Sequence, residues 1–238
     1  MTLEVLQSRE QIAAGRGALR RRGLSFATPH WRNWLARCRL LPGTLRIGDE
    51  LKSWDVLKTA EFIEARVPKD APVLDIGAFG SELPPVLHTL GYTRISAIDL
   101  NPRIARMPFA DAIDYRVANF LQAPYADGSF AAITAISVIE HGFDGTALAR
   151  ELARLLRPGG YFIASFDYWP DKVSTAGIRM FGMDWTIFSR DDVAQFLSVA
   201  GEHGLVPSGA LQFEAPSPAI FWAERNYTFA WLVLQRAG

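Results

Sequence analysis

Apolar positions along this chain fall into two alternating patterns. Short segments typical of strands cover residues 73–76, 94–99, 112–117, 130–137 and 161–166, and 130–137 is a nearly continuous apolar run, as expected of a strand buried on both faces. Longer segments with an apolar stripe at helical spacing lie at 49–67, about 81–91, 146–156 and 193–203. This repeated alternation predicts an α/β fold, a Rossmann-like doubly wound sheet, with its ligand site at the carboxyl ends of the strands.

The glycine-containing stretch at 73–85 organises the rest of the chain. Residues 73–76 are typical of a strand, Gly77 and Gly80 of a tight turn, and Ser81 of a helix cap. The glycines would let a ligand approach the backbone, and the helix N-terminus would offer it free amides. A binding site is therefore expected at this turn.

The residues of the turn also indicate the charge of the ligand. Asp75 disfavours a pyrophosphate and favours a ligand that carries an ammonium or sulfonium group, and S-adenosylmethionine carries both. The dinucleotide fingerprint G-x-G-x-x-G requires glycines where Phe79 and Glu82 stand. A nicotinamide oxidoreductase would therefore lack its fingerprint here.

Composition narrows the class of protein. The chain has 238 residues, of which 49% are hydrophobic and 21% charged, as in an ordinary globular domain with a modest elaboration. No apolar run approaches the roughly 20 residues that span a bilayer, and the N-terminus lacks a signal-peptide core, so we expect a cytoplasmic location. Cys38 is the single cysteine, and His30 and His88 have no ligand-like spacing, so we expect no metal site.

Charge is distributed unevenly. Residues 1–46 contain nine arginines against Glu4 and Glu10, a balance of 9 − 2 = +7, while the formal net charge of the whole chain is +0. The balanced total argues against a general nucleic-acid binder. The basic arm would either meet phosphates, anionic lipid or an acidic substrate, or pack on the acidic body of the protein.

The second strand, at 94–99, also ends in a carboxylate. Asp99 follows Gly77 by 22 residues (99 − 77), close to the ~20 at which Rossmann-like folds place an acid to bind ribose hydroxyls. The alternative is that Asp99 caps the next helix, but Asn101 before Pro102 is the better candidate for that cap.

These motifs in this order resemble those of the class I S-adenosylmethionine-dependent methyltransferases. VLDIGAFGSELP resembles their first motif, AIDLNP the second and RVANF the third, and AISVIEH and LLRPGGYF match later landmarks, over roughly residues 50–168. The resemblance implies S-adenosyl-L-methionine as cofactor. It also implies a seven-stranded sheet whose last two strands form an antiparallel pair, at Ala210–Glu214 and Tyr227–Gln235.

The resemblance also implies roles in cofactor binding. The methionine part would lie against Asp75 and the turn, Asp99 would bind the ribose, and Asn119 would accept a bond from the adenine amino group. Where the family usually has glycines, Phe79 and Ser81 would reshape the methionine pocket. The implied cofactor contacts are Asp75, Gly77, Ala78, Phe79, Gly80, Ser81, Asp99, Leu100, Asn119, Phe120, Ser137 and Glu140.

Methyl transfer needs few catalytic side chains because the sulfonium is already activated, and a base matters chiefly when an alcohol must lose a proton. His141, directly after the fourth strand, is the candidate base because its unperturbed pKa lies near neutrality. Alternatively, Glu140 and His141 only pack against the cofactor or cap the next helix. Asp167 and Tyr168 follow the fifth strand and are candidates to bind the acceptor or to orient the base.

We divide the chain into a basic, partly helical N-terminal arm at 1–48 and a methyltransferase domain at 49–238. Trp31 and Trp34 in the arm indicate that the stretch around them is ordered. A segment rich in aromatics and glycine, at about 169–190, would form a lid over a flat or sugar-like acceptor. The alternative for this segment is a plain hydrophobic packing loop.

The leading hypothesis is methyl transfer to a small-molecule acceptor, most simply an O-methylation of a hydroxylated or phosphate-bearing compound such as a sugar or glycan precursor. One alternative is an N- or C-methyltransferase of natural-product metabolism. The other is a non-catalytic module that binds the cofactor or a membrane surface.

Overall fold

The structure is a computed structural model that describes residues 2–28 and 45–238. The expectations for Trp31 and Trp34, and those for His30 and Cys38, lie outside the described residues.

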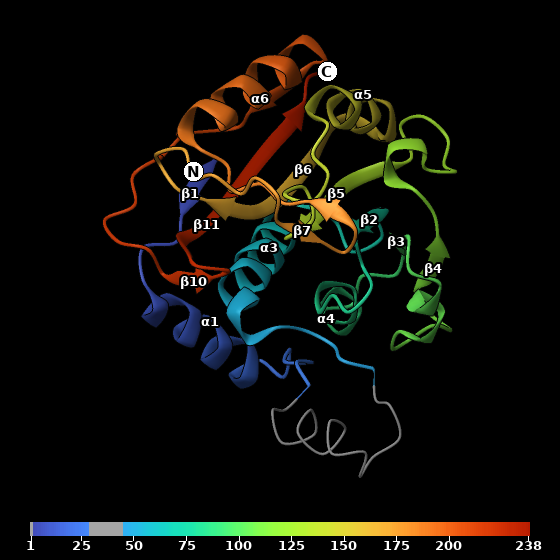
Figure 1. Cartoon of the computed structure of the whole chain (residues 1–238). Helices are drawn as coiled ribbons and strands as arrows, with labels where there is room; N and C mark the ends of the chain where they lie inside the picture. Colours follow the sequence, from blue (N-terminus) through green and yellow to red (C-terminus); the bar gives the residue numbers. More distant parts are fainter. Residues whose placement is uncertain (1, 29–44) are drawn as a thin grey trace.

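A mixed sheet runs through the middle of the molecule (Figure 1). The strands from β6 to β4 run parallel, as predicted, whereas β11 is antiparallel to β6. The predicted Rossmann-like sheet with an antiparallel edge is therefore confirmed. In spatial order its strands are β1 (Leu3–Val5), β11 (Arg225–Arg236), β6 (Leu156–Tyr168), β5 (Phe130–Ile136), β2 (Val73–Ile76), β3 (Ile95–Asp99) and β4 (Asp114–Val117).

The prediction of a strand at 210–214 is wrong. Along the outer edge of β11, β10 (Ile220–Trp222) pairs with one end, β9 (Leu205–Pro207) pairs with the other, and β1 lies between them. Residues 210–212 run beside β1 instead, where Gln212 N donates to the Leu3 carbonyl at 3.0 Å. The N-terminal strand takes the place beside β11 because it brings two apolar side chains, Leu3 and Val5, into the core.

Helices cover both faces of the sheet (Figure 1). On one face lie α1 (Arg9–Arg21), α3 (Ser53–Arg66) and α4 (Leu83–Thr89), and on the other α5 (Gly145–Leu155) and α6 (Arg190–Glu202). None of the helices in the described parts of the chain is long and apolar enough to cross a membrane. The remaining elements are the short helical turns η1 (Glu50–Lys52), η2 (Pro102–Arg106) and η3 (Phe120–Gln122) and the hairpin of β7 (Arg179–Met180) and β8 (Met183–Asp184).

Local capping signals set the helix ends. Ser189 caps α6, with its side chain accepting from Asp192 N. Asp49 caps η1, and the longer helix α3 begins only at Ser53. Similarly, Ser81 Oγ accepts from Leu83 N at 3.2 Å, so that α4 begins two residues later than predicted.

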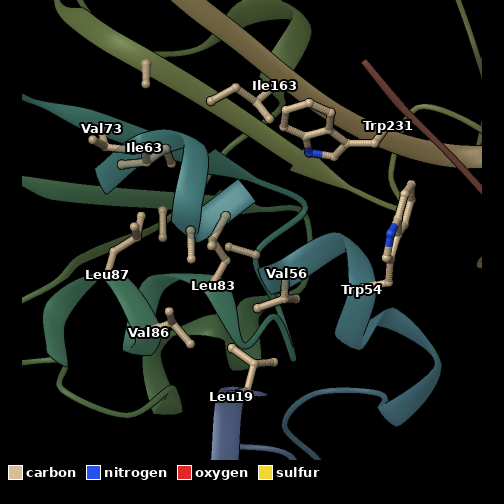
Figure 2. Close-up of a cluster of buried hydrophobic side chains, with 14 of the residues drawn as sticks. Leu19, Trp54, Val56, Ile63, Val73, Leu83, Val86, Leu87, Ile163 and Trp231 are labelled. Carbon is tan, nitrogen blue, oxygen red and sulfur yellow. The ribbon is translucent and has the colours of Figure 1, made fainter. Parts of the chain in front are cut away.

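Each face of the sheet buries its own apolar cluster. Figure 2 shows the cluster beneath α1, α3 and α4, where Leu19, Ile63 and Leu87 pack toward Ile163 of β6. The neighbouring Phe162 points to the opposite cluster, beneath α5 and α6, because successive side chains of a strand alternate between faces.

The N-terminal segment packs tightly on the body of the protein. Helix α1 lies so close to α3 that a Cβ atom on Gly15 would come within 2.9 Å of the Ser53 carbonyl. Together with β1 in the sheet, this contact ties the described part of the arm to the domain. The boundary near residue 48 stays a prediction.

Candidate active site

The carboxyl ends of β2, β3, β5 and β6 lie along one edge of the sheet, since these strands are parallel neighbours. This edge brings together the glycine turn after β2, Asp99 at the end of β3, the segment Ser137–His141 after β5 and Asp167 near the end of β6. Sequence-predicted residues from four separate strands therefore gather at the expected edge.

Both glycines of the turn have left-handed backbone conformations. Gly77 has φ +67° and Gly80 has φ +82°, values that side chains disfavour. At Gly77 there is also no space for a side chain, because a Cβ atom would lie 2.4 Å from a methyl carbon of Val138. The turn after β2 and the segment after β5 thus meet at a position that only glycine fits.

Asp99 is bonded directly to this turn. Its two carboxylate oxygens accept from Phe79 N at 3.0 Å and from Asn101 N at 2.7 Å. Asn101 caps η2, as expected, through a bond from Arg103 N to its side chain. Asp99 therefore holds the turn and its own strand end in register, and its oxygens still have lone pairs for other donors.

Asp75 is buried beside the turn. Thr134 Oγ1, directly opposite on β5, donates to Asp75 Oδ1 at 2.6 Å, whereas Oδ2 is buried with no hydrogen-bond partner among the described residues. Burial raises the pKa of Asp75 to about 7, against the hydrogen bonds from Thr134 and Ser81. A nearby cationic group would favour the ionised form of Asp75, so the unpartnered Oδ2 suits an ammonium or sulfonium ligand.

The residues predicted to hold the adenine lie farther along the same edge. Asn119 caps η3 by accepting from Leu121 N at 3.0 Å, and Phe120 is the first residue of that turn. Leu100, after β3, is 61% exposed. Their predicted contacts with a cofactor stay predictions.

After β5 the chain turns sharply at Ser137, which has φ +57°, and Ser137 Oγ bonds Glu140 Oε1. Glu140 is fully buried, and its other oxygen, Oε2, has no partner among the described residues. Burial first, and the nearby Asp167 second, raise the pKa of Glu140 to about 8, against the positive charge of Lys52. Glu140 therefore carries its proton at neutral pH.

His141 stands next to Glu140, and its buried Nδ1 atom has no hydrogen-bond partner in the described part of the chain. Burial, followed by the positive charge of Lys52, lowers the pKa of His141 to about 4. The sequence-based reason for assigning His141 as a base, a pKa near neutrality, therefore needs correction, because the imidazole is neutral well below pH 7. Its ring meets the exposed Phe181 of the β7–β8 hairpin edge-on, with ring centres 5.2 Å apart.

Asp167 completes this group from β6. Trp185 Nε1 donates to Asp167 Oδ2 at 2.8 Å, and Lys52 Nζ lies 3.6 Å from Oδ1. Burial raises the pKa of Asp167, against the ammonium of Lys52 and the bond from Trp185. The buried Trp185 shows that part of the predicted lid packs into the body, while Phe181 of the same segment is exposed.

Two residues of this group were missed by sequence reasoning. Lys52 and Asp55 come from the start of α3, far from the recognised motifs. Asp55 is fully buried and accepts from Ser165 Oγ at 2.8 Å, and burial raises its pKa. The available signal was a carboxylate in the apolar stripe between Trp54 and Val56.

Tyr168 does not join the others. Because it follows Asp167 on β6, its side chain points to the opposite face, where it is fully buried in the α5 and α6 cluster. Its hydroxyl donates to the Phe213 carbonyl at 2.8 Å. This placement corrects the predicted role at the acceptor to a structural one.

Several arginines of the N-terminal segment pair with acids of the protein. Arg16 and Glu82 form a buried bidentate pair with both N–O distances at 2.7 Å. Arg20, Arg22 and Arg46 pair with acids nearer the surface. These pairs support packing of the basic segment on the body, and its contact with a membrane stays a prediction.

Within residues 2–28 and 45–238, no group of three or more histidine, cysteine, aspartate and glutamate side chains is placed to hold a metal ion.

Comparison with known proteins identifies the domain. Residues 74–164 match the family model described as methyltransferase domain. The chain is 40% identical over 126 residues to a ubiquinone biosynthesis O-methyltransferase of Xanthomonas axonopodis pv. citri (strain 306), covering 49% of this chain and 52% of that protein. The chain thus spans about half the length of the curated relatives it matches.

Solved structures share the fold at low identity. A geranyl diphosphate C-methyltransferase from Streptomyces coelicolor A3(2), in complex with Mg²⁺, geranyl diphosphate and S-adenosyl-L-homocysteine, superposes with a TM-score of 0.55 at 17% identity, covering 76% of this chain and 78% of that one. The [4+2]-cyclase SpnF gives a TM-score of 0.55 at 13% identity, covering 80% and 83%. The second likeness shows that the fold alone does not determine the reaction.

Over residues 74–164 the chain is therefore similar to the methyltransferase domain family, and it shares the fold of solved S-adenosylmethionine-dependent methyltransferases.

Proposed function

We propose that this protein transfers the methyl group of S-adenosylmethionine to an oxygen atom of a small hydroxylated acceptor. The observation that carries the proposal is that the glycine turn, the buried acids Glu140 and Asp167, and His141 gather at neighbouring strand ends. The similarity to O-methyltransferases over half the chain supports oxygen as the methylated atom.

The residues at the turn fit the proposed cofactor. Asp75 Oδ2 is buried without a partner among the described residues and would receive a cationic group of the methionine part, next to the turn that begins at Gly77. Asp99 retains lone pairs for the ribose hydroxyls, and Asn119 and Phe120 would lie by the adenine. When bound, the cofactor supplies a methyl group already activated on a sulfonium.

The protein's own contribution is positioning and removal of one proton. A base must be unprotonated when it acts, and at neutral pH His141 is neutral while Glu140 holds its proton. We therefore assign His141 as the acceptor of the hydroxyl proton, while the indole N–H of Trp185 orders the carboxyl group of Asp167. A phosphate on the acceptor and contact of the basic segment with a membrane remain finer predictions.

The first experiment is calorimetric titration of the purified full chain with S-adenosylmethionine, S-adenosylhomocysteine and NAD. Binding of the first two without NAD is the expected result. Binding of NAD alone would contradict the charge reasoning at Asp75.

The second experiment identifies the methylated atom. The protein is incubated with methyl-labelled S-adenosylmethionine and catechol, phenol, aniline or toluene, and the products are analysed by NMR and mass spectrometry. A methyl ether from the hydroxylated probes supports the proposal. Label on nitrogen or carbon would favour the alternative methyltransferases, and cofactor binding with no transfer to any probe would favour a non-catalytic module.

A further inference from the structure

Lys52 occupies an unusual place at the carboxyl edge of the sheet. Its side chain is only 18% exposed, and its ammonium lies 3.3 Å from the centre of the Phe229 ring and 3.6 Å from Asp167 Oδ1. The latter distance corresponds to an ion pair but exceeds the range of a hydrogen bond. The ammonium therefore has donor protons that the described contact with Asp167 does not use.

Two buried carboxyl groups that feel the positive charge of Lys52 each have an oxygen without a partner among the described residues. Glu140 Oε2 and Asp55 Oδ1 are both buried, and neither has a hydrogen-bond partner among the described residues. The positive charge of Lys52 counteracts the effect of burial on the pKa of both carboxyls and also lowers the pKa of His141. Lys52 is thus the common electrostatic neighbour of residues from α3, β5 and β6.

The ammonium of Lys52 and the unpartnered carboxyl oxygens together indicate which kind of ligand group would bind here. An anionic carboxylate would meet three buried acids, and an ammonium ligand would meet Lys52, so neither suits the group as a whole. A neutral hydroxyl is both a donor and an acceptor and satisfies atoms of both kinds. The buried Trp185 and Tyr227, whose rings meet edge to face with centres 5.6 Å apart, add apolar packing beside Asp167, to which Trp185 is bonded.

We propose that Lys52 is a catalytic residue whose ammonium binds the reacting oxygen of the acceptor and stabilises the negative charge that develops there. The inference rests on the proposed O-methylation. In the step, the hydroxyl proton passes to His141, the oxygen lone pair forms the new O–CH₃ bond, and the C–S bond breaks with its electron pair returning to sulfur. The products are the methyl ether, S-adenosylhomocysteine and a proton on His141, while Lys52 keeps its protons throughout.

The surroundings of Lys52 hold it ready for this role. Residue 52 ends η1, which Asp49 caps by accepting from Leu51 N at 3.0 Å. The next residue, Ser53, accepts from Arg16 Nε at 2.9 Å, and this contact fixes the start of α3. A charge that is already in place does not need to reorganise as the oxyanion forms, and donors of this kind contribute most to catalysis.

The test compares Lys52→Met and Lys52→Arg with Lys58→Met. Lys58 is a matched control from the same helix region, because it is 21% exposed, lies over the Trp231 ring at 4.7 Å and pairs with Glu4 at 2.6 Å. The acceptors are a series of ring-substituted phenols and catechols whose hydroxyl pKa values differ. Cofactor affinity is measured separately by calorimetry.

We expect Lys52→Met to lower kcat/KM by about 100-fold, the loss typical of removing one oxyanion donor. The loss is greatest for the least acidic hydroxyls, because they depend most on stabilisation of the oxyanion. Lys52→Arg restores part of the activity, and cofactor affinity stays within about 2-fold in every variant because Lys52 is assigned to the acceptor oxygen. In cofactor-free protein, NMR titration shows the pKa of His141 rising in Lys52→Met, since a neighbouring positive charge has been removed.

Three results would overturn the inference. The first is an equal kcat/KM for Lys52→Met and Lys58→Met with hydroxylated probes that the wild-type protein methylates. The second is an equal loss across the acceptor series, and the third is a parallel loss of cofactor affinity, since both indicate a structural role. Failure of the wild-type protein to methylate any hydroxylated probe would instead refute the proposed function itself, and the role of Lys52 would fall with it.

Discussion

The buried pair of Arg16 and Glu82 makes a sharp prediction about stability. Glu82 precedes α4 directly after the glycine turn, and its carboxylate accepts two bonds from Arg16 at 2.7 Å. The same carboxylate accepts from the backbone amides of Phe26 and Ala27, each at 2.8 Å. Only 5% of the Arg16 side chain and 1% of the Glu82 side chain are exposed. One carboxylate thus ties α1 and the segment after it to the proposed cofactor turn.

Glu82→Ala would leave the guanidinium of Arg16 buried without its counter-charge and two amides without acceptors. Breaking a buried ion pair by removing one partner costs about 3–5 kcal/mol. We expect the free energy of unfolding to fall by that amount, a large part of the roughly 5–15 kcal/mol that stabilises a typical domain. The cost arises mainly from the charge left behind, so Arg16→Met combined with Glu82→Gln should be less damaging than the sum of the two single changes.

The assay is urea-induced unfolding followed by tryptophan fluorescence, with the free energy of unfolding obtained by linear extrapolation. Glu214→Ala is the control, because Glu214 pairs with Arg190 at the surface and its side chain is 75% exposed. In this control variant the free energy of unfolding should fall by less than about 1 kcal/mol. The reasoning would be refuted if Glu82→Ala lowered the free energy of unfolding no more than the control does. It would also be refuted if the double variant lowered it by the full sum of the losses of the two single variants.

Three further predictions concern the strand ends. Gly77→Ala should destabilise the protein by at least about 1 kcal/mol, because the backbone is left-handed and a Cβ would meet Val138 at 2.4 Å; thermal unfolding at the wild-type midpoint would contradict this. Asp99→Ala should weaken S-adenosylmethionine binding by roughly 10- to 100-fold, as expected for lost hydrogen bonds to a charged group, and unchanged affinity in calorimetry would remove the ribose assignment. For Glu140, folding raises the pKa from 4.5 to about 8, so the favourable contribution is complete below 4.5 and is lost as the pH rises through 8. The melting temperature of Glu140→Gln should therefore rise relative to that of the wild type as the pH increases from 5 to 8. A difference in melting temperature that stays constant over this range would show that Glu140 titrates normally.

Much of the fold and of the cofactor edge was predictable because it depends on short-range patterns. Strand and helix periodicities are read over a few residues, and the turn at Gly77 needs its glycine for the conformation of its own backbone. Asp99 was identified by its spacing from that glycine, and it does bond the turn through Phe79 N. The antiparallel partner of the last strand was misplaced because β1, from the other end of the chain, occupies that edge.

The acceptor side was harder to predict because it is assembled from distant parts of the chain. Lys52 and Asp55 reach Asp167 and Ser165 only when α3 packs across the end of β6. The basic N-terminal segment carried an ambiguous signal, and the structure shows that Arg16 is paired inside the protein. A local pattern can mark such a residue as unusual, as Asp55 is in its apolar stripe, but it does not name the residue's distant partner.

The sequence by itself determined the alternation of strands and helices in the central part of the chain, the glycine turn and the resemblance to methyltransferases, because each is encoded by neighbouring residues or by fixed spacings. Tertiary structure decided which side chains share the site and in what charge state. Asp167 faces the site while Tyr168 faces the opposite core because the pairing of β6 with β5 and β11 sets the orientation of each residue. His141 is neutral and Glu140 protonated at pH 7 because burial, which depends on the whole fold, shifts their pKa values in opposite directions.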